Sequence, residues 1–279
     1  MLSQRIVTGL ILAAGVLAAV FLLSFTLFAL LAALVFVIGA WEWSRLAHFS
    51  GLGRGLCTLA FALLLVACGW WIGFQRLAEE TMELRMAIVA ALAAVWWIVA
   101  AGLVRSYPAR AGLWSRRWEQ CLIGLLVIVP AWAALVFLRG EPRGEWLIVI
   151  LVVSVVCADT GAYFVGRRWG RHKLAPSVSP GKSTEGVYGG FACSLLFAVV
   201  LVLALGRSAD DWWLLALIVP ASLVSVVGDL LESMLKRQRG IKDSGSILPG
   251  HGGVLDRMDS VTAAAPVFVL AYVLTGWRL

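Results

Sequence analysis

Long apolar stretches alternate with short polar breaks over most of the chain. Divided at charged and turn residues, this pattern predicts nine helical spans: Ile6–Leu23, Leu27–Trp43, Leu56–Phe74, Met86–Val104, Cys121–Leu138, Trp146–Val165, Val187–Leu205, Trp212–Leu235 and Val261–Leu274. A helix needs about 20 apolar residues to cross the hydrocarbon core of a bilayer, which is about 30 Å thick. The pattern therefore predicts an all-α, polytopic integral membrane protein, in which residues 1–279 form a single membrane domain.

The break between the first two predicted spans is short, running from Ser24 to Thr26. One continuous helix would hold roughly 30 apolar residues and would exceed the bilayer thickness, so we expect two helices. We also expect the first stretch to be a retained span, because it runs almost directly into the second and no A-x-A cleavage site follows it.

Composition and charge support this fold class and exclude an ordinary soluble domain. Hydrophobic residues make up 61% of the chain and charged residues 14%, and the mean hydropathy is +0.92. With the N-terminus in the cytoplasm, 17 of the 23 Lys and Arg residues fall in cytoplasmic segments, which predicts an N-in, C-out topology. The cysteines lie in apolar stretches without a C-x-x-C pair and the histidines are scattered, which indicates neither disulfides nor a zinc site.

The eighth predicted span carries a polar stripe at its end. Asp229, Glu232, Ser233 and Lys236 are spaced i, i+3, i+4 and i+7, so they share one helical face over about 10 Å. A carboxylate within the hydrocarbon region costs about 2.5–3.5 kcal/mol, so each acid needs a partner, a metal or a water-filled cavity. Glu232 also fits an i, i+4 surface pair with Lys236.

Two other acids lie in or at the ends of predicted spans. Glu42 ends the second span, and Asp159 lies in the last turns of the sixth. Because a carboxylate is costly within the hydrocarbon region, each of these two acids is expected to have a polar partner. For Asp159, a role in a functional site and a pairing with one of the nearby arginines are both open.

The loop after the eighth span mixes charges with a run of glycines at 250–253. Glycine allows tight turns and a close approach of the backbone to a ligand. Asp256 and Asp259 are spaced i, i+3 at the start of the last span, where both can face the polar stripe, although Asp259 also fits a cap favoured by the helix dipole. Carboxylates bind hard cations and Lys or Arg neutralise phosphates, so the pattern indicates phosphoryl or nucleotidyl transfer on a Mg²⁺-bound nucleotide.

The loop between the sixth and seventh spans, PSVSPGKSTEG at 176–186, points to the same chemistry. Its Gly-Lys-Ser core is not a P-loop, because Pro176 stands where the first glycine is required and no strand precedes it. Ser179, Lys182 and Ser183 can still donate to phosphate oxygens beside the basic cluster at 167–173. A flexible Ser/Gly loop is the alternative.

The residues from Ser233 to Asp259 carry the pattern S-x2-K-R-x4-K-D-x-G-x2-L-P-x-H-G-G-V-x-D-R-M-D. This pattern resembles the signature of phosphatidate cytidylyltransferases, also called CDP-diacylglycerol synthases. The segments ADTGAYFVGRRWG, at 158–170, and SPGKSTEGVYGG, at 179–190, resemble two further segments of that family, and AWEW, at 40–43, resembles a minor one.

The resemblance implies a membrane enzyme that joins CTP to phosphatidic acid, giving CDP-diacylglycerol and pyrophosphate, with Mg²⁺ and K⁺ at a two-metal centre. It also implies a homodimer of nine-helix subunits in the inner (plasma) membrane, with the active site facing the cytoplasm and no nucleic-acid partner. Residues 141–279 are expected to hold the catalytic helices and loops, and residues 1–140 a scaffold with dimer contacts.

The resemblance also assigns roles to individual residues. Asp229 and Asp256 are implied metal ligands. The catalytic set adds Ser233, Lys236, Arg237 and Asp243. The expected substrate-binding residues are Asp159, Ser179, Lys182, Ser183, Lys242, His251, Arg257 and Asp259.

Two alternatives remain at this point. A CTP-dependent kinase of a long-chain, polyprenol-type alcohol has a similar architecture but is expected to lack the H-G-G-x-x-D-R-x-D loop. An ion-coupled transporter also carries acids within the membrane, but it is expected to hold them near the midplane of two matching halves. CDP-alcohol phosphotransferases are excluded because their D-G-x2-A-R signature is absent.

Overall fold

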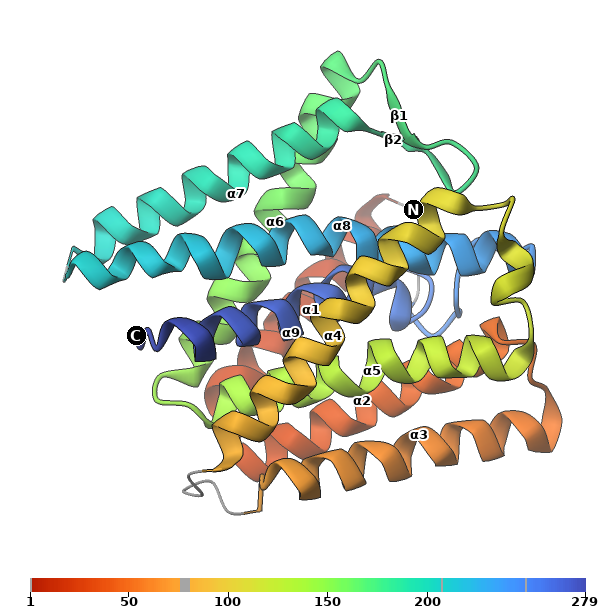
Figure 1. Ribbon diagram of the computed structural model, residues 1–279, viewed down its shortest axis with the longest axis horizontal. Helices are drawn as coiled ribbons and strands as arrows, with labels where there is room; N and C mark the ends of the chain where they lie inside the picture. Colours follow the sequence, from red (N-terminus) through yellow and green to blue (C-terminus); the bar gives the residue numbers. More distant parts are fainter. Residues whose placement is uncertain (1, 76–80, 207, 249) are drawn as a thin grey trace.

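The computed structural model describes residues 2–75, 81–206, 208–248 and 250–279, and the chain in these ranges forms nine α-helices (Figure 1). They are α1 (Leu2–Leu22), α2 (Phe25–Leu46), α3 (Gly51–Ile72), α4 (Thr81–Ser106), α5 (Arg117–Gly140), α6 (Gly144–Trp169), α7 (Thr184–Leu205), α8 (Trp213–Arg239) and α9 (Leu255–Thr275). Eight of them are long and apolar enough to cross a membrane, and Val7–Leu22 of α1 is a shorter apolar helix. The all-α, polytopic membrane fold is therefore confirmed.

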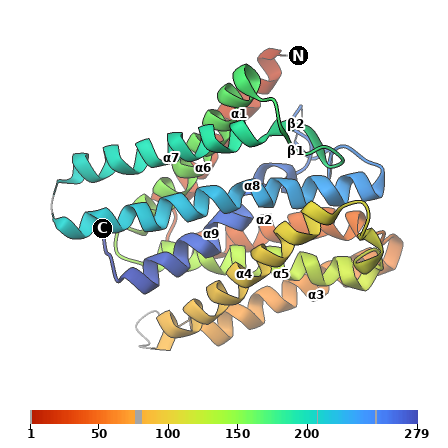
Figure 2. The same ribbon diagram turned by 45° about the horizontal axis from the view of Figure 1, so that its top comes forward.

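The separation of the first two helices is also confirmed. Ser24 caps α2, with its Oγ accepting a hydrogen bond of 3.4 Å from the backbone N–H of Leu27. A capping hydroxyl satisfies one of the backbone donors that every helix start leaves free. α1 then lies beside α6, where the rings of Phe21 and Trp146 have centroids 5.2 Å apart (Figure 2).

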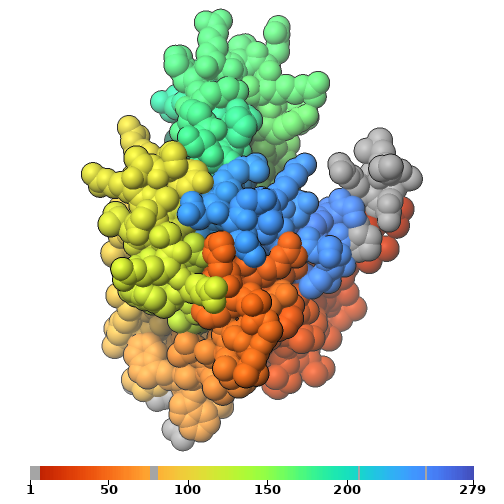
Figure 3. Space-filling model, turned by 90° about the vertical axis from the view of Figure 1, so that its right-hand side faces the viewer, coloured from red at the N-terminus to blue at the C-terminus, as the bar shows by residue number. Residues whose placement is uncertain are grey.

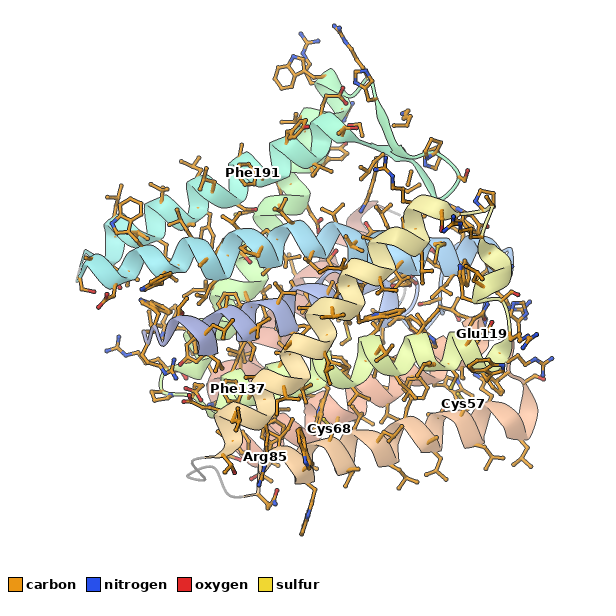
Figure 4. The ribbon with its side chains drawn as sticks, viewed as in Figure 1. Cys57, Cys68, Arg85, Glu119, Phe137 and Phe191 are labelled. Atoms are coloured by element: carbon orange, nitrogen blue, oxygen red, sulfur yellow. The ribbon has the colours of Figure 1, made fainter. Side chains whose placement is uncertain are left out.

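Helices α5 and α9 form the centre of the bundle. Small side chains on α9, including Ala263, Ala264 and Ala265, are fully buried and allow neighbouring helices to approach closely. Phe137 on α5 is 1% exposed among these helices, whereas Phe191 on the outer helix α7 is 38% exposed (Figure 4). Large apolar side chains on the outside of a helix bundle fit a surface in contact with lipid.

The loops expected on one side of the membrane do meet at one end of the bundle. There, Arg239 Nε donates to the carbonyl of Arg45 at 3.4 Å. At the opposite end, Arg139 donates to the carbonyl of Leu23 at 2.8 Å. These contacts agree with the predicted alternation of spans, while the compartment that each end faces stays a prediction.

The alternative of a flexible Ser/Gly loop between α6 and α7 is wrong, because the segment forms regular structure. Strands β1 (Lys173–Ala175) and β2 (Ser179–Ser183) pair antiparallel and form a short hairpin. Glu185, in the first turn of α7, accepts hydrogen bonds from the backbone N–H groups of Arg171 and His172, at 3.1 and 3.2 Å. These contacts hold the base of the hairpin, and the hairpin extends over α8 at the end of the bundle that carries the polar stripe (Figure 1).

Candidate active site

The hairpin and α8 contribute the first pair of charges. Lys182, on β2, places its Nζ 2.6 Å from Asp229 Oδ2 on α8. Ser233 lies one turn further along α8 and donates from its Oγ to Asp229 Oδ1 at 3.2 Å. The lysine therefore lies next to the carboxylate predicted to hold a metal, although 47 residues separate them in the sequence.

The start of α9 contributes the second pair. Asp256 accepts a hydrogen bond of 2.7 Å from Lys236 Nζ of α8, and further ones from the backbone N–H groups of Gly253 (2.7 Å) and Ser244 (3.0 Å). Gly252 adopts a positive φ of 82°, which favours glycine and turns the loop toward the carboxylate. Backbone donors and the α9 N-terminus stabilise the anionic form of Asp256. Asp256 lies in the first turn of α9, two residues after the N-cap residue Val254, whereas Asp259, for which a dipole-favoured cap was the alternative, lies beyond the first turn.

Glu42, from the end of α2, holds the same loop from the other side. Its buried carboxylate accepts the backbone N–H groups of Leu255 (2.8 Å) and Val254 (3.1 Å), and the hydroxyl of Ser244 (3.2 Å). Two of the free backbone donors at the start of α9 are thereby satisfied by a residue from the N-terminal half. A side chain at Gly253 would lie within 2.6 Å of both Glu42 oxygens, so this contact requires glycine.

Ser244 is the one residue of this arrangement that the sequence did not indicate. It stands at a variable position of the K-D-x-G pattern, and its hydroxyl lies 3.0 Å from Asp256 and 3.2 Å from Glu42. Its only signal in the sequence is a hydroxyl in a glycine-rich loop.

Glu232 does not form the surface pair that its spacing allows. Its carboxylate does lie 3.2 Å from Lys236 Nζ, but the side chains of Glu232 and Lys236 are only 3% and 11% exposed. Lys236 therefore bridges two buried carboxylates, Glu232 and Asp256. A buried charge needs such a partner to offset the loss of hydration.

Two adjoining cavities lie around these pairs. One, of about 440 Å³ between α6, α8 and α9, is lined by Asp159, Asp229, Lys236, Asp243, Asp256, Arg257 and Asp259, among others. The other, of about 540 Å³ under the hairpin, shares Asp159 and Asp229 with the first and adds Ser179, Lys182 and Ser183. No arginine pairs with Asp159 in the described part of the chain, so its position favours a role in the site.

Four predicted site residues do not line these cavities. Arg237 donates from Nε to the carbonyl of Val178 at 3.1 Å and thereby ties the hairpin to α8. Ser233 contacts the site through Asp229, as described above. The backbone carbonyl of His251 accepts a hydrogen bond of 3.2 Å from Arg257 Nε. Lys242 is exposed on the α8–α9 loop.

The donor set fits magnesium. Asp229 and Asp256 supply carboxylate oxygens to the cavity wall. The ammonium group of Lys182 lies 2.6 Å from Asp229, and that of Lys236 lies 2.7 Å from Asp256. Within the described residues, no three His, Cys, Asp or Glu side chains gather closely enough to enclose an ion by themselves. Mg²⁺ is commonly bound by one or two carboxylates together with substrate phosphates and water, which is what Asp229 and Asp256 can provide.

Figure 3 looks at this end of the molecule, where the hairpin region, the α4–α5 connection and the end of α8 meet. Segments from both halves of the sequence thus meet at this end of the molecule. Paired carboxylates, lysines and donor hydroxyls beside adjoining cavities suit the binding of a polyphosphate and a cation.

Comparison with known proteins gives consistent results over the whole chain. A family model described as the cytidylyltransferase family matches residues 3–275. A phosphatidate cytidylyltransferase from Pseudomonas aeruginosa is 47% identical over 280 residues, covering 99% of each chain. A protein of the same name from Haemophilus influenzae is 38% identical over 286 residues, covering 98% of this chain and 99% of the relative. A third, from Staphylococcus epidermidis, is 43% identical over 137 residues, about half of each chain.

Proposed function

The chain belongs to the phosphatidate cytidylyltransferase family and is an enzyme of that type. On this premise, we propose that it joins CTP to phosphatidic acid by a metal-assisted, in-line displacement. The observation that carries the proposal is the pair of carboxylate–lysine contacts, Asp229 with Lys182 and Asp256 with Lys236, beside adjoining cavities at one end of the bundle. Family membership also removes support from the kinase and transporter alternatives.

The reaction needs no nucleophile from the protein. An oxygen of the phosphatidate phosphate forms a bond to the α-phosphorus of CTP, and the bond from that phosphorus to the α–β bridging oxygen breaks, releasing pyrophosphate. Such transfers depend mainly on positioning and on neutralising charge. Lys182 and Lys236 supply cations beside the site, and Ser179 and Ser183 line the cavity under the hairpin. Arg257 lines the carboxylate cavity.

Asp229 and Asp256 would hold Mg²⁺, with K⁺ as a second ion. When bound, the metal reduces the repulsion between the two phosphate groups and polarises the α-phosphate. The chain's own contribution is to hold the two carboxylates in place. Ser233 and Lys182 do this for Asp229, and Ser244, Gly253 and Lys236 do it for Asp256.

The location of the site follows from its substrates. The phosphatidate keeps its acyl chains in the bilayer while CTP comes from water, so both meet where helix ends reach the membrane surface. The excess of Lys and Arg in the loops at the site's end favours the cytoplasmic face of the inner membrane. The relatives suggest a bacterial multi-pass protein, and we propose a homodimer as its assembly.

The test uses purified protein in detergent with phosphatidic acid, Mg²⁺ and each of the four nucleoside triphosphates in turn. We expect pyrophosphate and CDP-diacylglycerol only with CTP and lipid together. In a parallel reaction that supplies CTP and a long-chain alcohol in place of phosphatidic acid, release of CDP with phosphorylation of the alcohol would instead identify a kinase. The Asp256→Asn variant is expected to express normally and to lose turnover, and normal activity in that variant would refute the metal assignment.

A further inference from the structure

A third cavity, of about 620 Å³, lies between the end of α4, the hairpin, the first turns of α7, and α8. We call it the α8 groove. Its floor is an apolar stripe on α8 formed by Leu223, Val226, Val227 and Leu230, which are spaced i, i+3, i+4 and i+7. The stripe is about 10 Å long at 1.5 Å per residue. The volume lies within the range of about 300–1,000 Å³ that is typical of ligand sites.

Two cations lie at the polar end of this groove. Arg105, near the end of α4, and Lys173, on β1, both line it, and both are exposed. Neither forms an ion pair with a carboxylate in the part of the chain that the structure describes. At the other end, Leu223 is 38% exposed, and an exposed leucine within an apolar membrane-spanning helix fits contact with lipid. The groove therefore joins an apolar channel, open toward the bilayer, to unpaired positive charge.

The α8 groove adjoins the candidate active site. It shares Leu174, Val187 and Val226 with the cavity under the hairpin, which contains Lys182 and Asp229. A molecule lying along the α8 stripe would pass Val226 and reach Asp229, three residues further along the helix. The cavity under the hairpin then leads to the carboxylate cavity through their common wall at Asp159 and Asp229.

We propose that the α8 groove binds an acyl chain of the phosphatidate substrate, with Arg105 and Lys173 attracting its anionic headgroup and directing the phosphate toward Lys182. This inference rests on the proposed function, because it requires an anionic lipid as substrate. The apolar floor suits hydrocarbon and does not suit a nucleoside triphosphate, and the two unpaired cations complement a phosphate monoester. The lipid thus enters between α4 and α7, on the side of α8 away from Asp256.

The experiment fills the groove and compares long-chain with short-chain lipid. Val227→Trp narrows the groove at its middle. Leu223→Trp narrows it at the exposed end, where the fold can accommodate a larger side chain because Leu223 is 38% exposed. Val200→Trp, at an exposed position of α7 outside the groove, is the matched control. For each variant, KM is measured for dioleoyl phosphatidate, dihexanoyl phosphatidate and CTP, and size-exclusion chromatography checks the fold.

We expect the groove variants to raise KM for the long-chain lipid about tenfold, equivalent to about 1.4 kcal/mol. KM for CTP and for the short-chain lipid should stay within about twofold, since neither places a long chain in the groove. The Val200→Trp control should match the unmodified protein. An equal rise for both lipids, or an unchanged KM for the long-chain lipid in both groove variants, would overturn the proposal.

The cationic end is tested separately. Arg105→Gln combined with Lys173→Gln should raise KM for both lipids without changing KM for CTP, and Arg110→Gln, on the same basic segment but outside the groove, should change neither. If the unmodified protein makes no CDP-diacylglycerol from any lipid, the proposed function fails. If it does, and these cations leave lipid KM unchanged, the function stands and the groove assignment fails.

Discussion

Replacing Glu42 with glutamine should lower catalytic turnover even though Glu42 lines none of the site cavities described above. The Glu42 side chain accepts three hydrogen bonds, two of them from backbone N–H groups at the start of α9. Glutamine keeps one acceptor oxygen and turns the other into a donor, so at least one buried N–H of Val254 or Leu255 loses its partner. Glu42→Gln thus perturbs the position of Asp256 without touching its carboxylate.

The magnitude follows from these contacts. A hydrogen bond to a charged group contributes about 1.5–3 kcal/mol, and loss of the negative charge near the α9 N-terminus adds to this. Each 1.36 kcal/mol of lost transition-state stabilisation lowers the rate tenfold, so we expect kcat to fall by roughly 10- to 100-fold. KM for CTP should change much less, since the cavities keep their lining side chains.

Glu141 offers a matched control at the opposite end of the bundle. Glu141 is also a buried carboxyl. It accepts a hydrogen bond of 2.9 Å from the Tyr272 hydroxyl and lies 3.7 Å from Arg278 Nε. Burial raises the pKa of Glu141 above its ordinary value, so a neutral amide costs less there. We expect Glu141→Gln to keep kcat within about twofold.

Two measurements check the Glu42 prediction. Initial rates over a range of CTP and phosphatidate concentrations separate kcat from KM, and hydrogen–deuterium exchange reports the amides at 254–255 directly. Exchange there should speed up in Glu42→Gln and stay unchanged in Glu141→Gln, because only the former loosens the start of α9. Equal activity and equal exchange in the two variants would show that α2 does not position the loop.

Three further predictions concern the site and the helices that support it. Ser244→Ala removes the hydroxyl shared by Asp256 and Glu42, and kinetics should show a fall in kcat of roughly tenfold; an unchanged kcat would contradict the contact. Chelation of divalent cations should abolish turnover and added Mg²⁺ should restore it, as followed by pyrophosphate release; activity that survives chelation would exclude the metal assignment. Gly161→Val places a Cβ atom 2.5–2.6 Å from atoms of α7, so α6 and α7 must separate. Overpacking of this kind costs about 1–3 kcal/mol, so the midpoint of thermal unfolding in detergent should fall. An unchanged midpoint would show that the α6–α7 crossing can relax around the larger side chain.

Much of the chemistry was predictable from local spacing. The polar stripe of α8 and the i, i+3 aspartates of α9 follow from helical periodicity, which acts over a few residues. The structure brings Asp229 and Asp256 to the same cavity, as the sequence led us to expect, although the meeting of the two helices depends on their packing. The pairing of Glu232 with Lys236 also followed from spacing, but its burial did not, because burial depends on which helices pack over that face.

The sequence by itself determined the membrane class and the nine helices, because apolar run length is a local property of the chain. Helical spacing, loop composition and the family resemblance together indicated the acids and cations of the site. Only the tertiary structure decided that the 173–183 segment forms a hairpin over α8, since two such short strands persist through contacts such as Arg237 with Val178 and Glu185 with the hairpin base. It also decided that Glu42 caps α9 across more than 200 residues of sequence. Hydrogen bonds between such distant residues depend on how helices pack, and no short-range pattern carries that information.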